Sequence, residues 1–336
     1  MMEVTMSSDC IRMLLIGAGF MGETHVEAAA ELENVKFVGI VDSNSERAEE
    51  FGKKHKLECF DNLEQAIEKL NPDAVDICTP TTTHLPIIRL CAEKRVHCLC
   101  EKPVSLSIED AREIGKIDSA DCRIMVAQVL RFWPEYEYAL DVAQSKKYGD
   151  IISIDCKRFC SPPDWNDWMT LPDKGGGAVI DLQIHDLDFI MDVLGPPRAI
   201  NSKGSLFNGA YNTVYNSLDY GSGISVCSEG SMVIPQSYPF RMWYRIVFAN
   251  ATLEFDFWRS KGERLMVCPA EGDMFNPELP ATDAYAGEIA YFARQLLADE
   301  PFDLCPLQSS ISALELCLAS KLSCETGSAV DFLGVS

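Results

Sequence analysis

The sequence predicts an α/β protein with two domains: a doubly wound parallel sheet at the N-terminus, and behind it an α+β domain with a large, mostly antiparallel, open sheet. Three observations predict this organisation. A chain of 336 residues is long enough for two hydrophobic cores. Short apolar runs alternate with helix-patterned segments up to residue 127, and closely spaced β-rich runs follow from residue 151. We therefore expect domains over residues 1–127 and 128–336, with the last helix packed back on the first domain.

Two kinds of segment alternate in the predicted first domain. Buried strands are predicted for the apolar runs 11–17, 35–41, 74–78, 96–100 and 123–127. Helices are predicted for 23–32, 46–54, 63–70, 85–93 and 108–117, where apolar residues recur at helical spacing. This repeated β-α winding is typical of a parallel sheet that carries helices on both faces.

The predicted second domain is rich in strands. They are predicted over 151–159, 199–207, 212–220, 224–233, 241–248 and 252–258, and their close succession indicates an antiparallel sheet. One helix, 178–194, follows three consecutive glycines, and two more helices, 284–298 and 307–325, come near the end. The sequence contains no long linker, so we expect the two domains to pack firmly.

Composition argues against several classes of function. The formal net charge of -22 repels phosphate backbones and anionic lipid, so neither nucleic acid nor a membrane surface is an expected partner. No apolar run is long enough to span a bilayer, and residues 1–10 do not resemble a signal peptide. The 14 cysteines stand singly in apolar runs, without histidines at zinc-site spacing. We therefore expect structural thiols, no metal site and a reducing, cytoplasmic location.

A glycine-rich turn follows the first predicted strand. Residues 16–22 read I-G-A-G-F-M-G, which fits the pattern G-x-G-x-x-G. A glycine triplet can simply mark a tight turn, but this one stands between a strand and a helix, and Asp42 ends the next strand twenty positions beyond Gly22. Together these features predict a Rossmann domain that binds a dinucleotide. Its predicted contacts from the turn are Gly17, Gly19, Phe20, Met21 and Gly22.

The residue at the end of the second strand favours NAD over NADP. The Asp42 carboxylate can accept hydrogen bonds from the adenosine ribose, and it repels a 2′-phosphate. Ser43, also a predicted cofactor contact, and Asn44 bring no positive charge. Arg47 lies one helical turn further and has the length to reach a 2′-phosphate, although a solvated helix residue is the simpler interpretation. We therefore predict NAD as the cofactor.

Two motifs carry candidate catalytic residues. Glu101 and Lys102 follow the fourth predicted strand, at the carboxyl edge where ligands of open α/β sheets bind. A lysine there can hydrogen-bond a substrate oxygen and assist proton transfer, although many loop lysines are merely solvated. Asp181 and His185 are four residues apart on one predicted helix and so share a face. That face is either a solvated stripe or a site, and histidine is the side chain best suited to exchange a proton near neutral pH.

These motifs occur in an order that resembles one family. The order is G-A-G-F-M-G, V-D-S-N, T-P-T-T-T-H, C-E-K-P and finally G-G-G-A-V-I-D-L-Q-I-H-D-L-D. It resembles the glucose-fructose oxidoreductase, inositol dehydrogenase and rhizopine catabolism protein (Gfo/Idh/MocA) family over nearly the whole chain. The resemblance implies NAD-dependent hydride transfer to or from a sugar, inositol or related polyol, or its keto form. It also implies a cis Lys102–Pro103 peptide and a homodimer or homotetramer formed through the C-terminal sheet.

The same resemblance implies roles for particular residues. The catalytic group is Lys102, Asp181 and His185. The cofactor contacts near the nicotinamide are Thr79, Pro80, Thr81, His84, Glu101 and Lys102; the family often has asparagine where Thr81 stands. Position and residue type, rather than the resemblance, give the candidates for the substrate pocket: Gln128 and Arg131 at the domain junction, and Trp165 and Trp168 ahead of the glycines. Tryptophan faces pack well on the C–H surfaces of sugars, although either tryptophan can equally anchor the core.

Two other functions are compatible with the same motifs. Some relatives of this kind oxidise a sugar transiently to labilise a glycosidic bond, and act as NAD-dependent glycosidases or lyases. A non-catalytic NAD-binding regulator is a further possibility, and its expected mark is a damaged catalytic set. Since Lys102, Asp181 and His185 are all present, the sequence favours an NAD-dependent oxidoreductase that acts on CH–OH groups.

Overall fold

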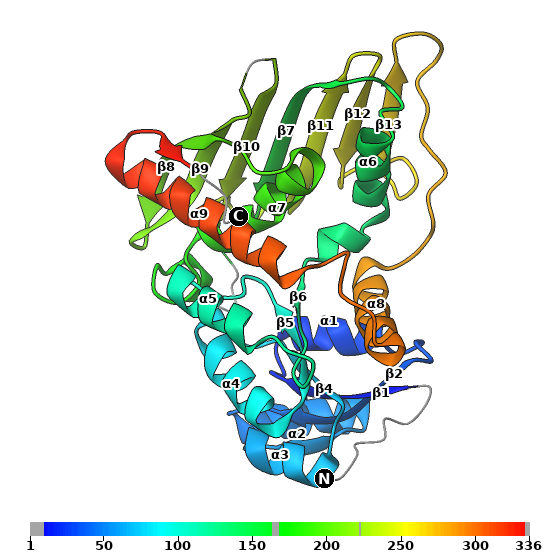
Figure 1. The fold of residues 1–336 in the computed structure, drawn as a ribbon, viewed down its shortest axis with the longest axis vertical. Helices are drawn as coiled ribbons and strands as arrows, with labels where there is room; N and C mark the ends of the chain where they lie inside the picture. The colour runs from blue at the N-terminus through cyan, green and yellow to red at the C-terminus, as the bar shows by residue number, and fades with distance from the viewer. Residues whose placement is uncertain (1–9, 163–167, 222, 333–336) are drawn as a thin grey trace. The chain divides into compact units, whose positions relative to one another are not determined.

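The structure is a computed structural model that describes residues 10–162, 168–221 and 223–332. It contains two compact units (Figure 1). The first unit comprises the described residues up to Phe132 together with Thr282–Ile311. The second unit comprises the described residues of Trp133–Ala281 and those from Ser312 onward. The chain therefore returns to its first unit after it has built most of the second.

A six-stranded parallel sheet forms the centre of the first unit, in the order β3-β2-β1-β4-β5-β6. Its strands are β1 (Ile11–Ile16), β2 (Val35–Val41), β3 (Glu58–Phe60), β4 (Ala74–Ile77), β5 (His97–Glu101) and β6 (Ile124–Ala127). The predicted doubly wound fold is confirmed. Only β3 was not predicted, because three residues are too few to show an apolar run. The strand order reverses between β1 and β4, which makes the carboxyl ends of these strands the expected ligand site.

Helices join and cover these strands (Figure 1). They are α1 (Phe20–Ala28), α2 (Ser45–His55), α3 (Leu63–Leu70), α4 (His84–Lys94), α5 (Ile108–Ile117) and α8 (Ala284–Ala298), with short 3₁₀ turns η1 (Thr81–Thr83) and η2 (Val129–Phe132). The side chains of Asn44, Asn62 and Ser107 cap α2, α3 and α5 by accepting a backbone N–H, so these helices begin close to their predicted starts. α8 packs against α1, β1 and β2.

The second unit is built on an eight-stranded sheet in the order β13-β12-β11-β7-β10-β9-β8-β14. Its strands are β7 (Ile151–Phe159), β8 (Ala199–Phe207), β9 (Ala210–Asp219), β10 (Ser225–Ser231), β11 (Arg241–Phe248), β12 (Ala251–Asp256), β13 (Leu265–Pro269) and β14 (Val330–Asp331). β7 and β10 are parallel and the other pairs are antiparallel, which confirms the predicted mostly antiparallel sheet.

One face of this sheet is buried under helices. They are α6 (Pro134–Gln144), α7 (Gln183–Leu194) and the later part of α9 (Leu307–Thr326). The aromatic rings of Tyr136, Phe189, Tyr244 and Phe255 pack together between the helices and the sheet. α6 was not predicted, although proline in its first turn and two acidic residues beside it are helix-start signals. Across the described part of the chain, no helix combines the length and the apolar character needed to cross a membrane.

Candidate functional site

At each of the three predicted glycine positions in the turn after β1, a different physical constraint favours a residue without a side chain. Gly17 has a φ of 103°, and a Cβ there would lie 2.5 Å from the carbonyl oxygen of Cys78. A Cβ on Gly22 would lie 2.1 Å from the carbonyl oxygen of Gly17, so only glycine lets α1 start this close to the turn. A Cβ on Gly19 would meet nothing within 4 Å. The open space at Gly19, at the start of α1, suits the approach of a pyrophosphate to the helix N-terminus.

Asp42 lies at the carboxyl end of β2 and is almost fully buried. Its oxygens accept the backbone N–H groups of Ala18 at 2.9 Å and Asn44 at 2.8 Å. Arg47 donates two further hydrogen bonds to this carboxylate. Its Nε lies 3.0 Å from Oδ2 of Asp42, and a terminal guanidinium nitrogen lies 2.7 Å from Oδ1. Burial alone would raise the pKa of Asp42, but these hydrogen bonds and the Arg47 charge lower it, so the group is a carboxylate at neutral pH. Arg47, predicted as a solvated helix residue, instead pairs with Asp42 while its side chain stays half-exposed.

The loop after β4 is held by its own side chains. The Thr83 hydroxyl lies 2.7 Å from the Thr79 hydroxyl and 2.7 Å from the carbonyl oxygen of Pro80. The Nε2 atom of His84 lies 3.0 Å from the carbonyl oxygen of Thr79, and burial lowers the pKa of this histidine. Thr81 is buried. The predicted segment from Thr79 to His84 is therefore a turn closed by its own hydrogen bonds, with a neutral histidine at the start of α4.

Lys102 follows β5 directly. Its backbone N–H donates to Oε2 of Glu101 at 2.9 Å, and the Lys102–Pro103 peptide is cis, as the resemblance implied. Since β2, β1, β4 and β5 are consecutive neighbours in a parallel sheet, Asp42, the glycine turn, the Thr79 loop and Lys102 all come from the same edge of that sheet. The first unit thus brings together the predicted cofactor residues and one of the three predicted catalytic residues.

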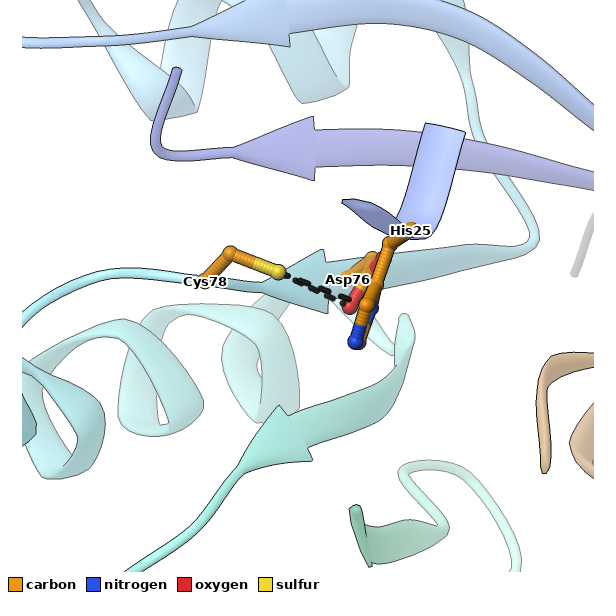
Figure 2. A group of neighbouring side chains, drawn as sticks. All are labelled: His25, Asp76 and Cys78. Atoms are coloured by element: carbon orange, nitrogen blue, oxygen red, sulfur yellow. Dashed lines mark hydrogen bonds and ion pairs between the residues drawn. The ribbon is translucent and has the colours of Figure 1, made fainter. Parts of the chain in front are cut away.

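A cluster of buried ionisable side chains lies beside this edge and was not predicted (Figure 2). His25 Nδ1 lies 2.9 Å from Oδ2 of Asp76, and both side chains are fully buried. The Cys78 sulfur lies 3.6 Å from His25 Nδ1 and 3.5 Å from Asp76 Oδ1. Among the residues that the structure describes, these three offer ligand atoms within 4.8 Å of one another, as a metal ion would require. The 2.9 Å contact is a hydrogen-bond distance, so a shared proton accounts for the cluster without an ion.

The sequence did contain one signal for this cluster. His25 stands three residues after Gly22, on the side of α1 that is buried. Asp76 comes from β4 and Cys78 follows that strand directly, and their proximity to His25 is a property of the packed unit alone.

Asp181 and His185 belong to the second unit. The predicted helix 178–194 is correct from Gln183 onward, but its first turn, η4 (Ala178–Leu182), is π-helical, so the assumption of one regular helix was wrong there. Asp181 is buried and His185 is partly exposed. Close packing within the second unit explains two of the preceding glycines. A Cβ on Gly175 would lie 2.4 Å from Met169, and a Cβ on Gly177 would lie 2.8 Å from Ala210.

Polar residues buried under α7 support this segment. The guanidinium of Arg158 on β7 donates hydrogen bonds to the Asp186 carboxylate, at 2.8, 3.2 and 3.3 Å. The side-chain amide of Gln183 also donates to Asp186, at 3.2 Å. The oxygen of Gln183 in turn accepts from Asn216 at 2.9 Å and from Ser228 at 2.7 Å. The alternative of a solvated polar stripe on the face of Asp181, His185 and Asp188 is wrong for Asp181 and Asp188, both of which are buried.

Comparison with known families decides what this arrangement belongs to. Residues 11–128 match the model described as "Oxidoreductase family, NAD-binding Rossmann fold", and residues 136–254 match the "GFO/IDH/MocA C-terminal domain". The chain belongs to the Gfo/Idh/MocA family. The predicted resemblance and the predicted NAD-binding Rossmann domain are thereby confirmed.

Individual members of the Gfo/Idh/MocA family resemble the chain at low identity. D-glucoside 3-dehydrogenase of Escherichia coli is 28% identical over 213 residues, which are 60% of this chain and 59% of that protein. Rhizopine catabolism protein MocA of Rhizobium meliloti is 26% identical over 265 residues, 76% of this chain and 82% of that protein. A levoglucosan dehydrogenase solved with NADH and levoglucosan has the same fold, with a TM-score of 0.86 at 19% identity over 96% of this chain and 99% of that one.

The candidate substrate residues lie in different surroundings. Gln128 is buried, with Nε2 3.5 Å from the Ser310 hydroxyl, and Arg131 donates to the carbonyl oxygen of Leu304 at 2.8 Å. Both therefore contact the returning C-terminal segment of the first unit. Trp168 begins a short 3₁₀ turn, η3 (Trp168–Thr170), and Trp165 lies outside the described residues. Their contribution to a substrate pocket stays a prediction.

Proposed function

We propose that this member of the Gfo/Idh/MocA family is an NAD-dependent dehydrogenase that acts on a CH–OH group of a sugar, inositol or related polyol, or on its keto form. The observation that carries the proposal is the position of Lys102. It stands at the carboxyl end of β5, on the sheet edge that carries the glycine turn and Asp42. In the second unit Asp181 and His185 complete the predicted catalytic set. The named dehydrogenase activity of the E. coli relative points to the same substrate class.

In the proposed mechanism, the residues position the substrate and move one proton. NAD, when bound, supplies the nicotinamide carbon that accepts the hydride. His185 takes the proton from the substrate hydroxyl, and the carbon-bound hydrogen then leaves with its electron pair. Lys102 and Asp181 hold the substrate oxygens, which places the reacting carbon and lowers the entropy cost of the transfer. Reduction of the keto form follows the same steps in reverse.

A substrate screen tests this function. The purified chain is incubated with NAD and, one at a time, inositols, hexoses, glucosides and aminosugars, and with NADH and the corresponding keto sugars. Stoichiometric change in NADH absorbance with at least one compound is the expected result. Release of a free sugar without net NADH would overturn the proposal in favour of an NAD-dependent glycosidase or lyase. NAD binding without turnover of any compound would favour a regulator.

Exchange of Asp42 for alanine is expected to shift cofactor preference toward NADP. In the wild type Asp42 repels a 2′-phosphate and pairs with Arg47. Without Asp42, Arg47 is released to bind that phosphate, a charged hydrogen bond of roughly 1.5–3 kcal/mol, or about 10- to 100-fold in the ratio of dissociation constants. Titration of protein fluorescence with NADH and NADPH measures the ratio. The double variant Asp42→Ala/Arg47→Ala should lose the gain, and a wild type that binds NADPH more tightly than NADH would contradict the assignment.

We also propose that the chain forms a homodimer or homotetramer through the face of the second sheet opposite α7. Tyr215, Cys227 and Arg245 are exposed on this face, because their neighbours along β9, β10 and β11 point toward the helices. Light scattering is expected to give twice or four times the mass of one chain. Arg245→Glu, which faces Asp155 on β7 with a like charge, should lower that mass, whereas a monomeric wild type would refute the proposal.

A further inference from the structure

A row of contacts leads from the buried His25 to the backbone of Lys102. We propose that His25 is a positioning residue: it holds the Glu101 carboxylate, which in turn holds Lys102 at the place where the lysine meets the substrate. This inference deepens the proposed function and rests on it, because it takes Lys102 as the group that contacts substrate.

The contacts run through three elements of the first unit. Asp76 on β4 holds His25 Nδ1 at 2.9 Å, and His25 Nε2 forms an ion pair with Oε1 of Glu101 at 3.3 Å. The second oxygen of Glu101 accepts the backbone N–H of Lys102 at 2.9 Å. An imidazole that carries protons on both nitrogens serves both carboxylates at once. A hydrogen bond to Asp76 holds Nδ1, whereas the contact of Nε2 with Glu101 is an ion pair without hydrogen-bond geometry, so charge attraction is what holds the carboxylate beside Lys102.

Burial makes these contacts strong. His25 and Asp76 are 0% exposed and Glu101 is 7% exposed, so little water competes with the charges. Burial would lower the pKa of His25, but the charge and hydrogen bond of Asp76 raise it well above its ordinary value. Burial would raise the pKa of Glu101, but the contact with His25 and the charges of His25 and Lys102 lower it. Both pKa shifts favour the charged pair that the geometry requires.

Other ionisable groups face the cluster and do not compete for the histidine. Burial raises the pKa of the Cys78 thiol, so it stays neutral. Glu288 of α8 is fully buried, and burial together with Glu101 and Asp76 raises its pKa well above the ordinary value, which leaves it uncharged. The Tyr285 ring lies 5.9 Å from the His25 ring. His84, whose pKa burial lowers, is the neutral group on the α4 side of Glu101.

A variant cycle tests the proposal. His25→Leu removes both contacts, His25→Gln keeps one hydrogen-bond donor, and Lys102→Met removes the positioned group. His25→Leu is expected to lower kcat about 10- to 100-fold, since a displacement of about 1 Å can cost this much, and His25→Gln should lose less. NADH affinity should stay within about threefold of wild type. The deuterium isotope effect on kcat should rise, because the chemical step becomes slower while folding does not affect that ratio.

The decisive measurement is the double variant. If His25 acts through Lys102, His25→Leu lowers kcat little further once Lys102 is methionine. An equal loss in both backgrounds, or an unchanged kcat, would overturn the proposal. Should His25→Leu fail to fold, Glu101→Gln carries the same cycle with the side-chain volume retained. His55→Gln is the matched control, since His55 also contacts a glutamate, Glu23 at 2.8 Å, and lies outside the cluster. Full turnover of Lys102→Met alone would instead refute the role that the proposed mechanism gives to Lys102, while the dehydrogenase function itself is tested by the substrate screen.

Discussion

Replacement of His185 by alanine is expected to lower turnover by about two to four orders of magnitude, with NAD affinity little changed. The expected loss is large because the proposed mechanism gives His185 the proton of the substrate hydroxyl, and alanine cannot accept it. NAD affinity should persist, because every predicted cofactor contact lies in the first unit and His185 lies in the second. Initial rates with the best substrate of the screen, beside fluorescence titration with NADH, measure the two quantities separately.

His55→Ala is a suitable control for this variant, because His55 is a histidine of the first unit that pairs with Glu23. Its turnover should match the wild type. If His185→Ala keeps wild-type turnover, His185 has no part in proton transfer, and Asp181 becomes the next residue to test. If turnover and NAD affinity fall together, the substitution has disturbed the fold rather than the chemistry.

Replacement of Arg158 by methionine is expected to destabilise the protein by about 3–5 kcal/mol. Arg158 of β7 is 3% exposed, and its guanidinium makes the contacts that hold Asp186 of α7 against the sheet. Methionine fills similar space but leaves the Asp186 carboxylate buried without its positive partner. Urea unfolding followed by circular dichroism measures the loss as a lower midpoint, provided that the slope of the transition stays the same.

The pH dependence of that loss has a definite sign. Burial raises the pKa of Asp186, and Arg158 opposes this rise. Without Arg158 the folded-state pKa lies further above the unfolded value, so the folded state binds more protons than the unfolded chain and its stability falls as pH rises. The variant should therefore lose more stability at pH 8 than at pH 5. A loss that is equal at both pH values would contradict this account.

Two further variants test whether the loss comes from the buried Arg158–Asp186 pair or from the general effect of removing a charge. Arg158→Met/Asp186→Leu removes both charges, and it should recover much of the stability, because no unpaired charge remains buried. Lys53→Met breaks an exposed pair with Glu49 at 3.4 Å and should change stability by less than about 0.5 kcal/mol. A loss below about 1 kcal/mol for Arg158→Met would show that water reaches Asp186.

Local patterns predicted most of the elements. The strands 35–41, 151–159, 199–207 and 241–248 and the helices 63–70, 108–117 and 284–298 match the structure at both ends. The patterns worked there because apolar spacing reflects which side of an element faces the core. They failed for β3, which is too short, and for η4, because a π-helical turn uses the same apolar residues as an α-helix.

The sequence by itself determined the fold class, the glycine turn with Asp42, and the order of motifs that marks the Gfo/Idh/MocA family. Each of these depends on residues that are close together in the sequence, because apolar spacing and the backbone conformations open to glycine are local properties of the chain. The tertiary structure alone decided that Arg47 pairs with Asp42, that Asp186 is buried against Arg158, and that His25 lies between Asp76 and Glu101. The physical reason is that the strength of a charge contact depends on burial and on distance in space, and neither is local in the chain.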